Sequence, residues 1–205
     1  MPQSPKPVMP RAVLFDLDNT LIDRDRAFRE CIEATFRASA VRDELLRLDA
    51  HGHGDRDMLL AAWKRHSDDS MTQAQLGARL SERIQPDSHL LEALRELSST
   101  TPLGIITNGG AETQRSKARA AGLDQVIPQE RFWVSSEFGR AKPDPAIFLH
   151  ASRCLGVAPG DCLFVGDHEP HDCAGAAAAG MNCHLVERAL DAGRLQALMR
   201  GEGLR

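Results

Sequence analysis

The stretch Val13-Leu14-Phe15-Asp16-Leu17-Asp18-Asn19-Thr20-Leu21 decides how this chain is organised. An apolar run ends in two carboxylates that stand one residue apart, and a polar turn follows. Residues 13–15 predict a buried parallel strand, because the run is short and begins with a β-branched side chain. Side chains two positions apart on a strand point the same way. Asp16 and Asp18 are therefore expected on one side of the chain, at the carboxyl end of the strand.

Ligands bind beyond the carboxyl ends of the strands in an open α/β sheet. Two carboxylates at that edge could hold a hard cation such as Mg²⁺, or could supply a nucleophile beside an acid/base group. A strand that simply runs into an acidic loop fits this segment equally well. The stretch by itself therefore leaves a functional and a purely structural interpretation open.

The whole sequence sets the broad class. Its 205 residues suit one domain, or one core with a modest insertion, and acids and bases are mixed to a net charge of −4. The sequence has no stripe of basic residues of the kind that would indicate a nucleic-acid partner, and it has no apolar run long enough to span a membrane. Residues 1–10 contain several prolines and predict a flexible tail. We expect neither nucleic-acid nor membrane binding.

Five scattered cysteines bear on the redox compartment. No two of them form a CxxC pair, and the spacing matches no familiar zinc site. The sequence therefore predicts reduced thiols and a cytoplasmic location.

The region after Leu21 changes to helical periodicity and shows no convincing strand up to residue 84. A first amphipathic helix is predicted from the three-and-four spacing of six residues, and a second lies near residues 41–48. Asp55 and Thr72 are predicted N-caps of a third and a fourth helix. The six residues of the first helix are Ala27, Phe28, Cys31, Ile32, Thr35 and Phe36.

Strands and helices then alternate to the end of the chain. Strands are predicted at 103–107, 132–134, 162–165 and 183–186, and helices at 90–97, 113–121, 145–155, 172–179 and 190–199. Such alternation is typical of βαβ units in a parallel sheet. The sequence predicts an α/β fold, with a Rossmann-like core formed by 11–22 and 87–205 and an all-helical insertion at 23–86.

Further polar residues follow the predicted strands and could converge with the two aspartates. Thr107 and Asn108 precede Gly109-Gly110, where free backbone N–H groups at a helix start favour an anion such as phosphate. Gly166-Asp167 closes a later strand. Each residue alone has an ordinary structural explanation, and their joint order supports a site.

A lysine precedes the helix predicted at 145–155. Lys142 stands just before Asp144, the expected N-cap, and Pro145, the expected first helical residue. Asp172, five residues after Asp167, is a candidate partner for the Lys142 charge. Asp172 could equally be an acid favoured by the dipole at a helix start.

With these residues in place, the sequence resembles the haloacid dehalogenase-like hydrolase superfamily from about residue 11 to 186. The DxDxT motif of that family stands at 16–20, its strand-ending Ser or Thr matches Thr107, and its lysine matches Lys142. Its GDxxxxD motif matches 166–172. Four motifs in order make a specific signal, and the helical insertion resembles the small helical cap of the family.

The resemblance implies a role for each residue. Asp16 is expected to attack phosphorus and form an aspartyl phosphate, and Asp18 to act as acid and then base, which requires a proton on Asp18 when substrate binds. Mg²⁺ is expected between Asp16, the backbone carbonyl of Asp18, and Asp167. The expected holders of the phosphate oxygens are Thr107, the Asn108 N–H and Lys142. Family members that break carbon–halogen bonds lack the second aspartate, so Asp18 favours a phosphatase or a phosphotransferase.

The expected substrate is a small phosphorylated metabolite, by analogy with the position of the cap in the family. Polar cap residues are candidates for recognising its leaving group: Arg24, His51, His53, Arg56, Trp63 and His66. The His51-Gly52-His53-Gly54 run resembles a metal site but suits an ordinary cap loop. His168 could contact metal-bound water or substrate, or only shape its loop.

Two other functions stay open. One is a phosphomutase or phosphotransferase of the same fold, and the other is a non-catalytic binding module. The quaternary structure is expected to be a monomer or a homodimer.

Overall fold

The structure is a computed structural model that describes residues 10–67 and 69–202. The predicted tail at 1–10 lies outside the described residues except for Pro10. Five parallel strands form one sheet in the order β3-β2-β1-β4-β5. They are β1 (Ala12–Phe15), β2 (Leu103–Thr107), β3 (Phe132–Val134), β4 (Cys162–Gly166) and β5 (Asn182–Leu185). The predicted α/β fold with a parallel sheet is confirmed.

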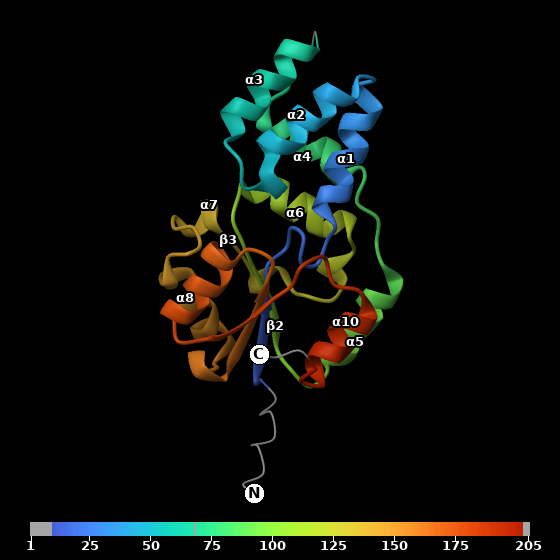
Figure 1. Ribbon diagram of the computed structural model, residues 1–205. Helices are drawn as coiled ribbons and strands as arrows, with labels where there is room; N and C mark the ends of the chain where they lie inside the picture. The colour runs from blue at the N-terminus through green and yellow to red at the C-terminus, as the bar shows by residue number, and fades with distance from the viewer. Residues whose placement is uncertain (1–9, 68, 203–205) are drawn as a thin grey trace, which may run out of the picture.

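Helices pack on both faces of this sheet (Figure 1). They are α5 (Ser88–Ser98), α6 (Ala111–Ala120), α7 (Ser135–Phe138), α8 (Pro145–Leu155), α9 (Ala174–Ala178) and α10 (Ala192–Met199). Side chains of β1 alternate between two apolar clusters: Val13 and Phe15 belong to one, and Leu14 to the other. Burial on both faces explains why β1 is a continuous apolar run. No helix in the described ranges has the length and apolar character needed to cross a bilayer.

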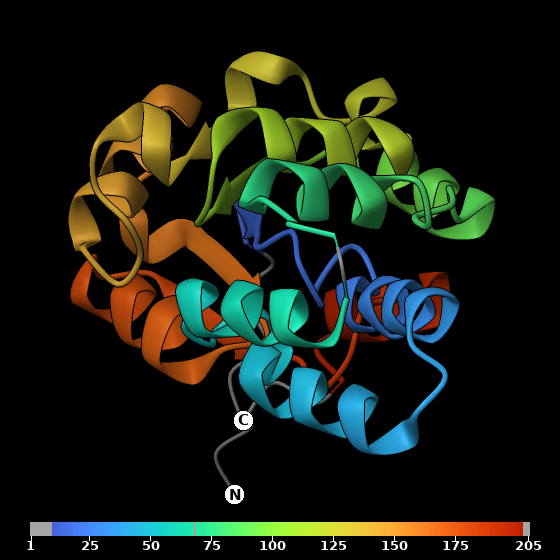
Figure 2. The ribbon, with the colours of Figure 1, turned by 90° about the horizontal axis from the view of Figure 1, so that it is seen from above.

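The segment between β1 and α5 is helical. Its helices α1 (Arg24–Thr35), α2 (Ser39–Asp49), α3 (Arg56–His66) and α4 (Gln73–Ser81) lie above the carboxyl edge of the sheet (Figures 1 and 2). The predicted N-caps are confirmed: the Asp55 side chain accepts from two backbone N–H groups of α3, and Thr72 forms a capping box with Gln75. We refer to residues 24–81 as the helical segment.

The helical segment packs closely on a helix that flanks the sheet: its α4 lies against α6. A Cβ atom at Gly77 of α4 would lie only 2.6 Å from Thr113 Cγ2 on α6. Glycine at this position therefore lets the two helices approach each other. The contact sets the helical segment directly over the ends of the central strands.

The region after β4 differs from the single helix predicted at 172–179. A π-helical turn, Glu169–Cys173, precedes α9. Within this wider turn, Asp172 Oδ2 accepts a hydrogen bond from the His168 N–H at 3.0 Å. The turn thus buries the Asp172 carboxylate instead of leaving it at an exposed helix start.

The expectation of reduced thiols is wrong for one pair of cysteines. Cys173 and Cys183 form a disulfide with a Cα–Cα distance of 5.3 Å, while Cys31, Cys154 and Cys162 are free. Packing of the turn after β4 against β5 brings the pair within bridging distance. Their sequence spacing resembles no disulfide or zinc pattern, so only the fold could reveal the bond. The cytoplasmic location, which rested on reduced thiols, stays a prediction without that support.

Candidate active site

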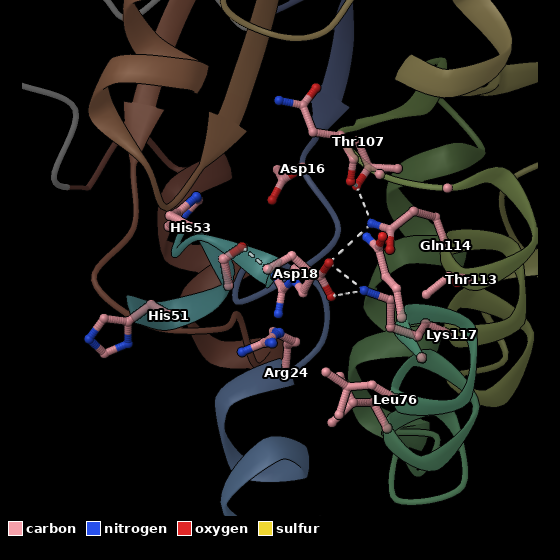
Figure 3. A pocket seen from close by; sticks show the side chains of 18 of the residues that line it. Asp16, Asp18, Arg24, His51, His53, Leu76, Thr107, Thr113, Gln114 and Lys117 are labelled. Atoms are coloured by element: carbon pink, nitrogen blue, oxygen red, sulfur yellow. Dashed lines mark hydrogen bonds and ion pairs between the residues drawn. The ribbon is translucent and has the colours of Figure 1, made fainter. Parts of the chain in front are cut away.

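The ends of three strands converge on one cavity. Asp16 follows β1, Thr107 closes β2, and Asp167 follows β4. Because β2 and β4 both pair with β1, these positions meet at the centre of the carboxyl edge. Beside it lies a cavity of about 630 Å³, lined by residues of the strand ends, α6 and the helical segment (Figure 3).

Lys142 lies between two buried carboxylates. Its Nζ donates to Asp16 Oδ1 and to Asp172 Oδ1, each at 2.6 Å. The side chain of Asn108 holds the Lys142 backbone from both sides, accepting from its N–H at 2.8 Å and donating to its carbonyl at 2.9 Å. The structure therefore joins Asp16, Asn108, Lys142 and Asp172 in one network, and it pairs Lys142 with Asp172 as the sequence suggested.

A glycine makes room for this network. A Cβ atom at Gly166 would lie 2.2 Å from Asp172 Oδ2. No Cβ atom can approach an oxygen so closely without displacing it. Gly166 is therefore the residue that allows the Asp172 carboxylate to sit against the end of β4, within reach of Lys142.

Burial and neighbouring charges set the protonation of the network. Burial raises the pKa of Asp16 from an ordinary 3.8 to about 7; Lys142 opposes this rise, and Asp172 and Asp167 add to it. Burial alone would lower the pKa of Lys142, but Asp16 and Asp172 outweigh it and raise the pKa. Lys142 therefore stays charged. The neighbouring carboxylates raise the pKa of Asp16, so a further positive charge beside them would be stabilised.

Asp18 faces a different partner. Lys117 on α6 contacts both carboxylate oxygens of Asp18, and Gln114 Nε2 donates to Asp18 Oδ2 at 3.0 Å and to Thr107 Oγ1 at 2.6 Å (Figure 3). Burial would raise the pKa of Asp18, but Lys117 and Arg24 outweigh it and lower the pKa. Asp18 is thus held ionised, whereas its expected role needs a proton at the moment substrate binds.

Sequence reasoning missed Lys117 and Gln114. Both are nearly fully buried on α6, at 3% exposure each, on the same face as Ala118. Polar residues that recur three apart on the apolar face of a helix are unusual, because burial of an unpaired charge is costly. That pattern could have marked α6 as a contributor to the site.

Three carboxylates could hold a cation. One oxygen from each of Asp16, Asp167 and Asp172 can be chosen so that all three lie within 4.8 Å of one another. Two of these residues share the single ammonium group of Lys142, so negative charge is in excess. An all-oxygen donor set of this kind suits Mg²⁺ or another hard cation. The residues present therefore fit the metal that the sequence led us to expect.

Two of the cap candidates lie on the cavity wall but are already paired. Arg24 is 3% exposed and forms a two-pronged ion pair with Asp49, with Nη2 at 2.6 Å from Oδ1. Arg56 donates to the same Asp49 oxygen at 3.1 Å and to the Gly52 carbonyl at 2.9 Å. Both guanidinium groups stabilise the turn that ends α2, and both face the cavity from this position.

The two histidines of this turn, His51 and His53, have different neighbours. His51 pairs with Asp25 and is 79% exposed at its side chain, and it and His53 also line the cavity (Figure 3). His53 Nε2 is 4.0 Å from Asp167 Oδ2. His53 packs its ring on His168 with centroids 3.7 Å apart. His168 therefore contacts the helical segment in addition to shaping its own loop.

Two of the cap candidates, Trp63 and His66, lie away from the cavity. Trp63 is fully buried and packs edge-on against Phe36, with ring centroids 4.9 Å apart. His66 pairs with Glu44 at 2.8 Å, and neither residue lines the cavity. Helical spacing places Trp63 in the core of the helical segment.

Known proteins are similar to this chain in sequence and in fold. The family model for haloacid dehalogenase-like hydrolases matches residues 10–180. An N-acylneuraminate-9-phosphatase from Mus musculus is 30% identical over 200 residues, covering 83% of this chain and 79% of the relative. A glyceraldehyde 3-phosphate phosphatase from Methanopyrus kandleri is 30% identical over 193 residues, covering 84% and 82%.

Solved structures agree on the fold. A family hydrolase from Deinococcus radiodurans with bound phosphate and sodium aligns with a TM-score of 0.67 at 23% identity, covering 96% of this chain and 97% of that one. A family hydrolase from Bacillus subtilis bound to magnesium aligns with the same score at 20% identity, covering 94% and 99%. The chain belongs to the haloacid dehalogenase-like hydrolase family. It is an enzyme of the phosphatase branch, which the second aspartate, Asp18, already favoured.

Proposed function

We propose that this protein is a Mg²⁺-dependent phosphomonoester hydrolase that works through an aspartyl phosphate on Asp16. The observation that carries the proposal is that Asp16, Thr107 and Lys142 line one cavity, with an oxygen of Asp167 within 4.8 Å of Asp16. Residues far apart in the sequence meet there with the charges that a phosphoryl group and a divalent cation require. The 23–86 insertion serves as a cap over this site, and 11–22 with 87–205 forms the core domain.

The reaction is divided between the two aspartates. A carboxylate oxygen of Asp16 attacks phosphorus as the bond from phosphorus to the leaving oxygen breaks, and Asp18 gives its proton to that oxygen. Asp18 then takes a proton from the water that cleaves the phosphorus bond to Asp16. The dianionic phosphate brings negative charge to the site, and this raises the pKa of Asp18 when substrate binds.

Positioning accounts for the rest of the catalysis. The Thr107 hydroxyl, the Asn108 N–H and Lys142 hold the phosphate oxygens, and Asp172 and the Asn108 side chain hold Lys142 in place. Phosphoryl transfer needs little covalent help, so fixed charges supply most of the rate. Mg²⁺, held by Asp16, the Asp18 carbonyl and Asp167, would neutralise negative charge on the phosphoryl group during transfer.

We propose a small phosphorylated metabolite as the substrate. The named relatives act on N-acylneuraminate 9-phosphate and glyceraldehyde 3-phosphate, both small phosphorylated compounds. A cavity of about 630 Å³ is in the range that holds such molecules. Arg24 and Arg56 on its wall favour polar or anionic leaving groups.

The test is turnover of p-nitrophenyl phosphate with Mg²⁺ and with excess EDTA, followed by a panel of phosphorylated metabolites scored by phosphate release. We expect phosphate release to require the metal. Release should not require an added sugar acceptor, which a phosphotransferase would need. Asp16→Asn should abolish turnover while the circular dichroism spectrum stays unchanged. Turnover by this variant would disprove the nucleophile, and no turnover by the unaltered protein on any substrate would favour a non-catalytic binding module.

A further inference from the structure

Three histidines from two distant segments gather at one place, and two of them, His53 and His171, line the cavity. His53 follows the short 3-10 turn Ala50–Gly52 of the helical segment, and His168 and His171 lie in the loop and π-helical turn after β4. Their rings pack together, with centroids 3.7 Å apart for His53 and His168 and 4.3 Å apart for His168 and His171. The proposed reaction assigns none of them a role.

The three rings bring nitrogen atoms close to one another. One ring nitrogen from each histidine can be chosen so that all three lie within 4.8 Å of one another. A tetrahedral ion bound at about 2.0–2.1 Å needs its nitrogen ligands roughly 3.4 Å apart. Imidazole binds a metal in its ring plane, so ring rotation has to close this gap and also turn the His53 and His168 rings, whose planes are now 22° apart. His53 is exposed and the other two are half-buried, which leaves room for this rotation.

One nitrogen of the cluster lacks a partner. His168 Nδ1 is buried and makes no hydrogen bond within the described part of the chain. Buried polar atoms usually have a protein, water or ion partner, so this nitrogen is available to a ligand from outside the chain. The Asp167 carboxylate lies on the same side, 4.0 Å from His53 Nε2, and its negative charge favours a cation there.

We propose that His53, His168 and His171 form a transition-metal site that joins the helical segment to the loop after β4. Imidazole nitrogens suit Zn²⁺, Co²⁺, Ni²⁺ and Cu²⁺, whereas Mg²⁺ prefers the carboxylate oxygens next to them. The two sites are therefore distinct in chemistry although they are neighbours. An ion bound by one histidine of the helical segment and two that follow β4 would hold the helical segment against the sheet beside the cavity.

The experiment is titration of the full-length protein with Co²⁺ in buffer with excess Mg²⁺, which keeps the carboxylates occupied. Tetrahedral Co²⁺ bound by nitrogen gives visible absorption that oxygen-bound, six-coordinate Co²⁺ lacks. We expect one strongly absorbing Co²⁺ per chain, displaced by Zn²⁺. His53→Gln should weaken binding by at least about 100-fold, because the loss of even an outer-shell partner costs 10–100-fold.

His51→Gln is the matched control, since His51 lies two residues away in the same turn and binds Asp25 instead. This variant should bind Co²⁺ like the unaltered protein, and Zn²⁺ should raise the melting temperature of both but not that of His53→Gln. Equal binding by His53→Gln, or no absorbing Co²⁺ in the unaltered protein, would overturn the proposal. None of these readouts depends on phosphatase activity.

Discussion

The ammonium group of Lys117 lies 2.5 Å from Oδ1 of Asp18, which stands 99 residues earlier in the chain. Lys117 comes from α6, so this pair joins the helix after β2 to the turn after β1. With Gln114, it fixes both the direction and the ionisation of the carboxylate expected to act as acid and base. In the proposed reaction Asp18 holds a proton when substrate binds, so this ion pair has to weaken at that point.

Replacing Lys117 tests this relationship. Lys117→Met removes a charge that lowers the pKa of Asp18, so this pKa should rise, and Asp18 should keep its proton to higher pH. The alkaline limb of kcat/KM against pH should therefore move upward, and kcat should fall by about tenfold, less than the 10²–10⁴-fold typical of losing an acid itself. Arg119→Met is the control, because Arg119 is on the same helix but pairs with Glu112 at the surface. An unmoved alkaline limb in Lys117→Met would show that Lys117 serves only the fold.

Asp16 should make stability depend on pH in the metal-free protein. Because its pKa is raised from 3.8 to about 7, chiefly by burial, the folded state holds more protons than the unfolded chain between these values. The contribution of this titration to the free energy of unfolding is fully present below about pH 4, and it is lost as the pH rises through about 7. Asp16→Asn carries no titrating group here and does not undergo this loss, so with EDTA at pH 8 the variant should be more stable than the unaltered protein, by up to about 4 kcal/mol at about 1.4 kcal/mol per pH unit.

Urea unfolding of both proteins at pH 5 and pH 8 would measure this difference. Asp18→Asn provides the contrast: the pKa of Asp18 is lowered, so its stabilisation is present at neutral pH and lost in acid. That variant should therefore lose stability at pH 8. A gain from Asp16→Asn that is equal at both pH values would rule out the Asp16 titration as its cause.

Gly166→Ala should disturb the Lys142 network. The added methyl group would collide with the Asp172 carboxylate, which must then move from Lys142 and the His168 N–H. We expect a loss of about 2–4 kcal/mol in the free energy of unfolding, typical of strain combined with a disrupted buried network. Gly160→Ala is the control, because its methyl group would meet only the Gly180 carbonyl at 3.8 Å. Equal stability of the two variants would contradict the close approach.

The disulfide can be tested by counting the free thiols of the protein. Thiol titration of protein that is denatured without reductant should find three free thiols per chain, from Cys31, Cys154 and Cys162, and five after reduction. Protein purified under oxidising conditions and protected from thiol exchange is the sample to use. Five thiols before reduction would show that Cys173 and Cys183 are not bridged.

Much of the fold could be predicted from local signals. The strand at Leu103–Thr107 and the helix at Pro145–Leu155 match their predicted bounds, because an apolar run between breakers, and an Asp cap followed by proline, are complete within a few residues. The predicted helix at 172–179 instead divides into a π-helical turn and α9, because Asp172 is drawn inward to Lys142. Its side chain forms a tertiary contact that no local pattern contains.

The sequence by itself determined which strands form, where they end, and therefore which acids, hydroxyl and lysine reach one edge of the sheet. Only the tertiary structure decided which groups pair there: Lys117 with Asp18, His53 with His168, and Cys173 with Cys183. The reason is physical. The periodicity and capping that form an element act within a few residues, whereas the partner of a buried charge, ring or thiol is chosen by the packing of distant elements.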